Sequence, residues 1–301
     1  MLKVSRKGSR DLNKKISLPD LDWHKSTWCP GCGDHAVLVA LKQAVIRLEL
    51  DPSKVIIVSG IGCSSKVSDY FRSFTFHTLH GRPLPVAQAI KLANPKLTVI
   101  VTTGDGDGYS IGVGHLIHAA RRNINISMIT MNNQVYSLTK GQYSPTAQEG
   151  FVSGTTPQGS RDQPIDAVAL ALASGAGFVA RSFSGFLKET SQLIEKAIQH
   201  NGFALVDDLS PCVTFNKVNT YTWFKQNIEN VKEDKSYDSS DIFSAFIKSI
   251  KSKKILIGLI FEKEMPTYED KVLYNSSGPI VFQDLILNEK EFLSMTEKFK
   301  Y

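Results

Sequence analysis

Two long hydrophobic runs dominate the middle of the chain, and each ends abruptly in polar residues. The first run, 97–103, breaks into the glycine-rich stretch GDGDG at 104–108, and the second, 124–131, breaks into Asn132-Asn133. Between them, residues 110–121 have the composition of a helix with small residues that allow close packing on a sheet. Strand, turn, helix, strand and turn together predict a βαβ unit.

The loops that end these two strands carry candidate magnesium and phosphate ligands. A right-handed crossover makes the strands parallel, so that Asp105 and Asn133 emerge at the same carboxyl edge. Their oxygens suit Mg²⁺, which shares its ligand shell with phosphates and water, and glycines let backbone N–H groups approach a phosphate. The GDG motif alone also fits an ordinary glycine-rich turn with a solvated aspartate. The added Asn-Asn pair favours a diphosphate held through Mg²⁺.

The remaining pattern extends this unit into a doubly wound, mostly parallel α/β sheet. The run at 203–206 is expected to close the sheet. Residues 143–164, rich in Ser, Thr, Gly and Pro, are expected to form a long functional loop. Predicted strands are 55–58, 178–180, 203–206 and 255–261, and predicted helices are 34–50, 83–94, 165–173, 185–200 and 241–250.

Length and composition allow one substantial core with an appendage. The chain has 301 residues and is 42% hydrophobic. We expect a basic arm at 1–27, an α/β domain at 28–224, and a C-terminal extension at 225–301 that contacts another subunit. No apolar run is long enough to cross a bilayer, and no signal sequence follows the basic start, so we expect a soluble cytoplasmic protein without membrane contact.

The net charge of +6 is concentrated at the N-terminus. Residues 1–17 hold six basic groups and one acidic group, a balance of +5, which leaves +1 for the rest of the chain. Because the body is nearly neutral, a nucleic-acid-binding surface is not expected. The arm reads as a solvated leader or as a segment that docks on an acidic partner.

Four cysteines form the second group of candidate ligands. Cys29 and Cys32 form a CxxC motif, and Cys63 and Cys212 each follow a predicted strand. A thioredoxin-like pair would follow a strand directly, which this motif does not, and disulfides are not expected without a signal peptide. The third interpretation is a four-cysteine centre, with either zinc or an iron–sulfur cluster as its metal, and the residues alone leave it open.

The GDGD and Asn-Asn motifs, followed by VYSLTKGQ at 135–142, resemble the thiamine diphosphate signature of 2-oxoacid:ferredoxin oxidoreductase β subunits. The resemblance covers roughly residues 28–223. It implies the thiamine diphosphate-binding fold of that family, and Mg²⁺ ligands at Asp105, Asn133 and the carbonyl of Val135. The cofactor contacts that it implies are Ile61, Gly62, Cys63, Ser64, His80, Gly104, Asp105, Gly106, Asn133, Ser137 and Leu138.

The same resemblance bears on the cysteines and on catalysis. The WCPGCG motif, the IGCS loop and a later Pro-Cys pair match the family's ligands for one [4Fe–4S] cluster, which are Cys29, Cys32, Cys63 and Cys212 here. Lys66 stands where the family has a lysine close to the substrate. His80 lies in an HGR motif, whose histidine reaches the diphosphate in that family. The resemblance therefore implies catalytic roles for Lys66 and His80.

The implied activity is CoA-dependent oxidative decarboxylation of a 2-oxoacid, such as pyruvate or 2-oxoglutarate, with electrons passing through the cluster to ferredoxin. An α subunit, or a fused γα subunit, is expected to supply the glutamate that activates the cofactor. Two other classes stay open at this point. One is a non-oxidative thiamine diphosphate decarboxylase or synthase subunit with a structural Cys₄ zinc site. The other is a non-catalytic binding or electron-carrier protein.

Overall fold

The computed structural model describes residues 16–272, 278–283 and 288–297. Six basic residues of the predicted arm lie in 1–15, outside these ranges. The rest of that arm packs on the body of the protein. Leu21 is fully buried, and the ammonium of Lys42 lies 2.6 Å from the carboxylate of Asp22. The chain therefore joins the folded body before it reaches the CxxC motif.

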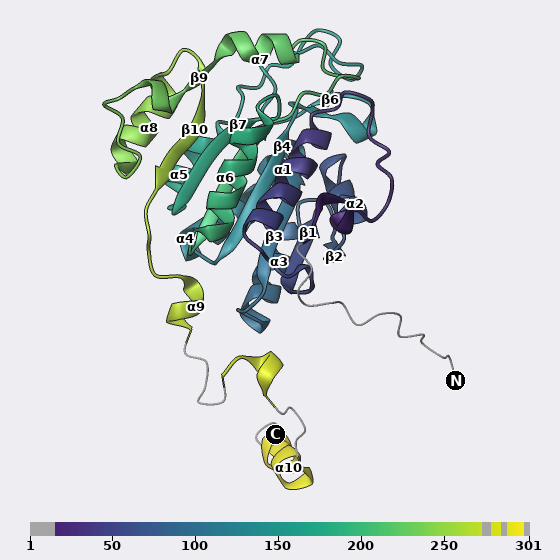
Figure 1. Cartoon of the computed structure of the whole chain (residues 1–301), viewed down its shortest axis with the longest axis vertical. Coiled ribbons are helices and arrows are strands. Elements are labelled where there is room, and N and C mark those ends of the chain that lie inside the picture. The colour runs from purple at the N-terminus through teal and green to yellow at the C-terminus, as the bar shows by residue number, and fades with distance from the viewer. Residues whose placement is uncertain (1–15, 273–277, 284–287, 298–301) are drawn as a thin grey trace.

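One eight-stranded sheet runs through the centre of the molecule (Figure 1), in the order β2-β1-β3-β4-β8-β7-β10-β9. Neighbouring strands are parallel except β7 and β10, which are antiparallel. The predicted mostly parallel α/β sheet is thus confirmed. Its strands are β1 (Val55–Ser59), β2 (Phe74–His77), β3 (Thr98–Gly104), β4 (Ile126–Asn132), β7 (Phe178–Phe183), β8 (Phe203–Leu209), β9 (Ile228–Asn230) and β10 (Ile255–Glu262); β5 (Val135–Tyr136) and β6 (Gln142–Tyr143) form a separate hairpin.

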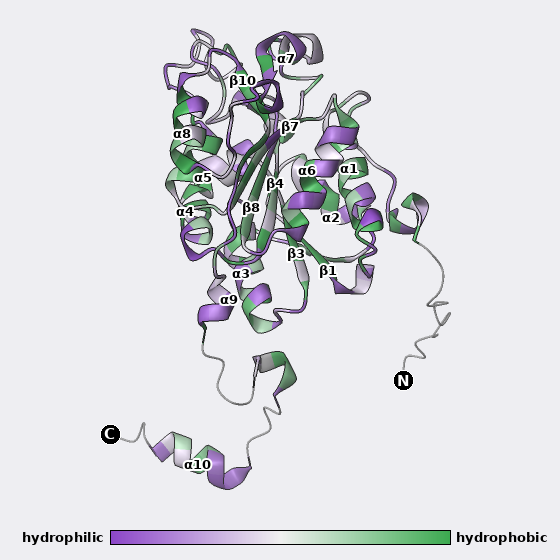
Figure 2. Ribbon diagram, turned by 60° about the vertical axis from the view of Figure 1, so that its left-hand side comes forward, coloured by the Kyte–Doolittle hydropathy of each residue, from purple (hydrophilic) through white to green (hydrophobic). Residues whose placement is uncertain are grey.

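Helices cover both faces of the sheet, as the doubly wound prediction requires. Figure 2, which looks nearly along the sheet, shows α3, α4, α5 and α8 on one side and α1, α2 and α6 on the other. The helices are α1 (Asp34–Arg47), α2 (Val67–Tyr70), α3 (Pro83–Ala93), α4 (Val113–Arg122), α5 (Ala167–Ala173), α6 (Leu187–Gln199), α7 (Tyr221–Asn227), α8 (Ile242–Lys251), α9 (Tyr268–Lys271) and α10 (Glu289–Glu297). Short 3₁₀ turns are η1 (Leu18–Leu21), η2 (Pro52–Lys54), η3 (Ser64–Lys66), η5 (Ser137–Thr139), η6 (Val231–Glu233) and η7 (Ile280–Phe282), and η4 (Asp107–Ile111) is a π-helical turn.

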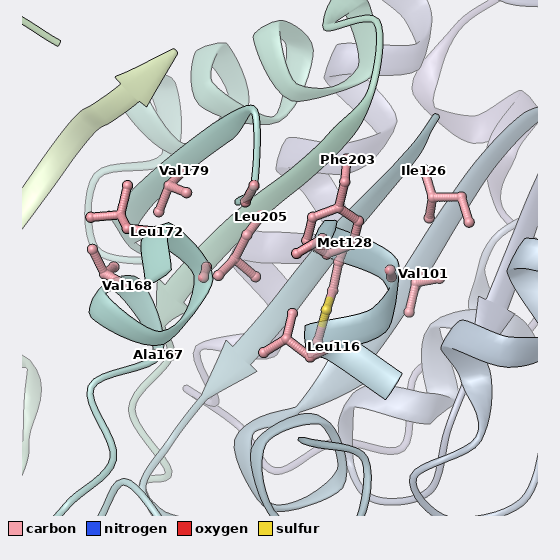
Figure 3. Packing of buried hydrophobic residues seen from close by; sticks show 14 of the residues in the cluster. Val101, Leu116, Ile126, Met128, Ala167, Val168, Leu172, Val179, Phe203 and Leu205 are labelled. Atoms are coloured by element: carbon pink, nitrogen blue, oxygen red, sulfur yellow. The ribbon is translucent and has the colours of Figure 1, made fainter. Parts of the chain in front are cut away.

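The core explains why the central strands read as continuous hydrophobic runs. All seven residues of β4 are buried, because helices cover the sheet on both sides. On one face, Met128 and Phe203 of the sheet pack near Leu116 of α4 (Figure 3). Full burial of such a side chain contributes about 1.5–3 kcal/mol. The sheet is therefore a rigid support for the loops at its carboxyl edge.

One topological prediction was wrong. The run at 203–206 does not close the sheet, because β8 lies between β4 and β7, near the sheet's centre. The α6 crossover returns the chain to the side of β4, and all seven residues of β8 are buried. Strands β10 and β9, from the predicted C-terminal extension, then continue the sheet beyond β7. A short apolar run does not reveal its position in a sheet, since edge order depends on crossovers elsewhere.

The helix predicted at 110–121 begins later than its pattern suggested. A π-helical turn occupies Asp107–Ile111, and α4 starts at Val113. The backbone N–H of Gly112 donates to the carbonyl of Asp107 at 3.0 Å, which closes the wider turn. Such turns are often found at functional sites, and this one follows directly on the GDGD motif.

The strand order has a switch point between β1 and β3. From β1 the chain first moves outward to β2, and then crosses back to β3 and β4. Ligands of open α/β sheets bind in the crevice that such a reversal leaves at the carboxyl ends of the strands. The loops after β1, β3 and β4 all end at this crevice, so the fold places the candidate motifs together.

Candidate active site

A pocket lies at the switch point, lined by the loops that follow β1, β3 and β4 and by His80 from the loop after β2. All eleven residues predicted to contact the cofactor line it, and so does Val135. The glycine-rich loop, the IGCS loop and the Asn-Asn turn therefore share one site, as the sequence predicted. Four lining residues were not predicted, and they are Asp107, Met131, Tyr136 and Thr139.

Asp105 is almost fully buried at the base of this pocket, with 2% exposure. Its Oδ2 accepts hydrogen bonds from the hydroxyls of Ser144 and Thr146, each at 2.5 Å, and from the backbone N–H of Gln134 at 3.1 Å. Burial raises the pKa of Asp105 to about 6, and the two hydroxyls oppose that rise. Ser144 and Thr146 belong to the long loop at 143–164, and nothing in the sequence of this loop indicates that they bind the Asp105 carboxylate.

The Asn-Asn turn reaches Asp105 through an unusual backbone conformation. Gln134 has a φ of 63°, in the left-handed region that residues other than glycine rarely adopt. This turn aims the Gln134 N–H at Asp105, and it lets the side-chain oxygen of Asn133 accept from the Val135 N–H at 3.1 Å. The predicted meeting of Asp105 and Asn133 at one edge is confirmed.

The second aspartate of the GDGD motif organises the pocket wall. Oδ1 of Asp107 lies 2.6 Å from Nδ1 of His80 and accepts backbone N–H bonds from Gly81 at 2.7 Å and Ile61 at 3.0 Å. Its Oδ2 accepts from the hydroxyl of Thr103 at 2.6 Å. Asp107 therefore ties the HGR and IGCS loops to β3. Sequence reasoning missed this role, since the motif does not show which aspartate faces inward.

Two further features of the pocket are a buried hydroxyl without a partner in the described part of the chain and a glycine that packs closely against an aromatic ring. The hydroxyl of Ser64 is buried, lines the pocket and has no hydrogen-bond partner among the described residues. Gly106 packs under the ring of Tyr136, and a Cβ there would lie only 2.2 Å from a ring carbon. The Tyr136 hydroxyl donates to the Gly106 carbonyl at 3.2 Å. A buried hydroxyl without a partner is costly, and a bound anion would satisfy it.

Lys66 lies outside this pocket lining. Its ammonium donates to the hydroxyl of Thr27 at 3.0 Å, on the segment that leads into the CxxC motif. The side chain is thus close to the cysteine loops rather than to Asp105. Its predicted catalytic role stays a prediction.

Direct contacts draw the loops that carry the four cysteines together. The indole N–H of Trp28 donates to the Cys63 carbonyl at 2.8 Å, and the Gly33 N–H donates to the Pro211 carbonyl at 3.2 Å. A Cβ on Gly33 would lie 2.6 Å from the Ser210 hydroxyl, so only glycine permits this approach. All four cysteines are free thiols; Cys29 is exposed and Cys212 is buried.

Two of the sulfur atoms, those of Cys32 and Cys63, lie in a setting that favours neutral thiols. Burial raises the pKa of Cys32 and of Cys63, and the nearby Asp34 carboxylate adds to the rise, followed by the sulfur of Cys212. Two sulfurs receive hydrogen bonds: Cys63 from the Ser137 hydroxyl at 3.3 Å, and Cys212 from the Phe215 N–H at 3.5 Å. Within residues 16–272, 278–283 and 288–297, no three His, Cys, Asp or Glu side chains form a group suited to one metal ion.

Comparison with known proteins defines the class to which this fold and site belong. The family model for the C-terminal TPP-binding domain of thiamine pyrophosphate enzymes matches residues 60–207, which include the whole pocket lining. The model for the C-terminal part of the pyruvate ferredoxin oxidoreductase beta subunit matches residues 212–275. The chain thus carries a thiamine pyrophosphate enzyme domain followed by a segment typical of oxidoreductase β subunits.

Full-length relatives agree with these models. The 2-oxoacid:ferredoxin oxidoreductase subunit beta of Saccharolobus solfataricus is 41% identical over 85% of this chain and 88% of its own. A subunit beta from Aeropyrum pernix is 37% identical over 91% and 93%. A solved 2-oxoglutarate:ferredoxin oxidoreductase from Magnetococcus marinus, with 2-oxoglutarate, coenzyme A and succinyl-CoA bound, superposes with a TM-score of 0.83 at 38% identity, covering 86% of this chain and 89% of that one.

This chain belongs to the family of 2-oxoacid:ferredoxin oxidoreductase β subunits. It is therefore a subunit of an oxidoreductase, and the name of the family implies a partner α subunit. In the described part of the chain, no helix is both long and apolar enough to span a membrane.

Proposed function

We propose that this chain binds thiamine diphosphate, Mg²⁺ and one [4Fe–4S] cluster, and acts with an α or fused γα subunit. The complex catalyses CoA-dependent oxidative decarboxylation of a 2-oxoacid, such as pyruvate or 2-oxoglutarate, and passes the electrons to ferredoxin. One observation carries the proposal. The buried Asp105 pocket and the three sulfur-bearing loops lie at one edge of one sheet, and the Ser137 hydroxyl joins Asn133 of the pocket to Cys63.

The pocket fits a diphosphate held through a cation. Ser64 supplies a buried hydroxyl without a partner among the described residues, and Gly104 and Gly106 line the pocket without side chains. Three donors occupy Oδ2 of Asp105, so we assign Oδ1 to the metal. The side-chain oxygen of Asn133 and the carbonyl of Val135 complete a set of hard oxygen ligands that suits Mg²⁺.

The same pocket explains why a partner is needed. Thiamine diphosphate, when bound, supplies the chemistry that breaks the bond between the carboxylate and the carbonyl carbon of a 2-oxoacid. Among the described residues that line the pocket there is no glutamate, so we assign the activating glutamate to the α subunit. His80 is held by Asp107 at the pocket wall, and we assign it to the diphosphate. We place Lys66 at the substrate side, near the CxxC segment.

The C-terminal extension offers a surface for that partner. Helix α8 exposes three apolar side chains at helical spacing, Phe243, Ile247 and Ile250, which are 75%, 51% and 58% exposed. Such a stripe on one helix face is typical of a protein–protein contact. This supports the predicted role of 225–301 in subunit contact.

We assign an iron–sulfur cluster rather than zinc to the cysteine loops, because the chain belongs to a family of ferredoxin oxidoreductase β subunits. A structural Zn²⁺ binds four thiolates at about 2.3 Å around one ion. A [4Fe–4S] cluster binds each thiolate to a different iron, and so it needs a wider cage. Hydrogen bonds to the sulfurs of Cys63 and Cys212 match the donors that such ligands accept.

The proposal is tested by purifying the chain anaerobically with its partner subunit. We expect about four iron and four sulfide per β chain for a [4Fe–4S] cluster, and reduction of a viologen dye that depends on a 2-oxoacid and CoA. A panel of 2-oxoacids then identifies the substrate. Zinc without iron would contradict the oxidoreductase function and favour the non-oxidative alternative.

The cofactor site has its own test. Asp105→Ala is expected to abolish Mg²⁺-dependent thiamine diphosphate binding, measured by calorimetry, because it removes the carboxylate at the base of the pocket. Asp69→Ala is the matched control, since Asp69 is exposed and lies outside the pocket lining. Unchanged binding in Asp105→Ala would instead favour a non-catalytic protein.

A further inference from the structure

The Ser137 hydroxyl lies between the two halves of the site. Ser137 has 9% exposure at the start of the η5 turn, where its Oγ accepts a hydrogen bond from Nδ2 of Asn133 at 3.3 Å. The same Oγ donates to the sulfur of Cys63, also at 3.3 Å. A hydroxyl has one hydrogen. Because that hydrogen is directed to sulfur, Ser137 does not donate it to a diphosphate.

We propose that Ser137 is a positioning residue that couples the magnesium–diphosphate site to the iron–sulfur cluster. Through its hydrogen bond to Cys63, Ser137 contributes to the reduction potential of the cluster. When Asn133 binds the cation, this contribution of Ser137 grows and the potential rises. This inference rests on the proposed function, since it requires both groups to be bound.

The direction of the effect follows from electrostatics. The O–H of Ser137 places its positive end on the Cys63 sulfur, which stabilises the extra electron of a reduced cluster; hydrogen bonds to the ligand sulfurs are among the determinants of such potentials. When the Asn133 oxygen binds a cation, its amide N–H becomes a stronger donor to Ser137. Hydrogen bonds in a chain polarise one another, so the bond to sulfur strengthens as well.

A second contact ties the same asparagine to another cysteine loop. The side-chain amide of Asn216 donates to the Asn133 carbonyl at 3.0 Å, and the Asn216 backbone N–H donates to the Cys212 carbonyl at 3.2 Å. Asn216 is 2% exposed. Asn133 is therefore fixed against both the Cys63 and the Cys212 loops, so a cation bound by Asn133 acts on a rigid frame.

The test measures the midpoint potential of the cluster by EPR at controlled potentials, in the complete complex, with and without Mg²⁺–thiamine diphosphate. In the wild type we expect a higher potential with the cofactor bound. Ser137→Ala is expected to have a lower potential and to lose most of the cofactor-dependent rise. Ser137→Thr keeps the hydroxyl and should retain both.

Ser65→Ala is the matched control. Ser65 is also buried, two residues after Cys63, but its hydroxyl donates to the Gly62 carbonyl at 2.6 Å rather than to a sulfur. The potential should not change in this variant. A purely structural effect of losing a buried hydroxyl near Cys63 would lower the potential in Ser65→Ala as much as in Ser137→Ala, and that result would overturn the inference.

A reciprocal measurement needs no variant. Coupling between two sites is symmetric, so the cofactor's dissociation constant should be smaller for the reduced protein than for the oxidised one. Each tenfold difference corresponds to 59 mV for one electron. Equal dissociation constants in the two oxidation states overturn the inference and leave the proposed function intact. Wild-type protein without iron and sulfide overturns both.

Discussion

Nδ1 of His80 lies 2.6 Å from Oδ1 of Asp107, so that a buried carboxylate orients the histidine at the pocket wall. The same oxygen holds the backbone N–H groups of Gly81 and Ile61. The side chain of His80 is 38% exposed, whereas that of Asp107 is 1% exposed. The aspartate therefore acts behind the histidine, as a support for two loops of the site.

Asp107→Asn should weaken thiamine diphosphate binding by about 10–100-fold, the typical loss when a residue that supports a ligand is changed. In the wild type, four hydrogen bonds end on the Asp107 carboxylate. Asparagine replaces one of its two acceptor oxygens with an amide nitrogen, which is a donor. Calorimetry measures the dissociation constant. If Asp107 acts through His80, then His80→Ala and the double variant should bind equally weakly, and additive losses would contradict this relation.

Gly106→Ala should destabilise the protein by about 1–3 kcal/mol, as overpacked sites do, because the new Cβ would lie 2.2 Å from the Tyr136 ring. Gly114→Ala is the matched control. Gly114 also has an ordinary φ, no atom lies within 4 Å of its Cβ position, and it lies within α4. Alanine there should stabilise the protein by about 0.5–1 kcal/mol. Melting temperatures compare the two, and equal losses would contradict the steric argument.

If the four cysteines hold the proposed cluster, Gly33→Ala should lower the iron content of anaerobically purified protein. A Cβ at Gly33 meets Ser210 at 2.6 Å and Ser184 at 2.8 Å, so the turn with Cys32 must move away from the loop with Cys212. Gly154→Ala, with open space around its Cβ position, should keep the wild-type iron content. Full iron content in Gly33→Ala would show that these loops need not approach so closely.

Asp208 should make stability fall as the pH rises. Burial raises the pKa of Asp208 to about 8, opposed by hydrogen bonds from Ser182 at 2.5 Å and Thr190 at 3.3 Å. Its Oδ1 has no hydrogen-bond partner among the residues described, so no donor stabilises the charged form at that oxygen. The folded protein binds this proton more tightly than the unfolded chain does. The contribution of Asp208 to the free energy of unfolding is therefore complete below pH ~4 and is lost as the pH rises to about 8.

Asp208→Asn replaces the protonated carboxyl with a neutral group of the same shape. Between pH 4 and 8, the free energy of unfolding of the wild type should fall relative to the variant by up to about 1.4 kcal/mol per pH unit. Denaturant unfolding across this range measures the difference. Parallel curves for the two proteins would show that Asp208 is ionised throughout.

The sequence alone determined which residues end the strands, and therefore most of the pocket. Hydrophobic runs locate β1, β3, β4 and β8, and right-handed crossovers bring the carboxyl ends of parallel strands to one edge. That rule was enough to predict the meeting of Asp105 with Asn133. It works because it depends only on local periodicity and on the handedness of the chain.

Only the tertiary structure decided which side chains support these ligands. Ser144 and Thr146 bind Asp105 from an irregular segment, Asp107 holds His80, and Ser137 bridges Asn133 and Cys63. Likewise, the central place of β8 depends on the α6 crossover and on the strands added after it. These contacts join segments far apart in sequence, and a hydrogen bond between two loops leaves no periodic signal in either one.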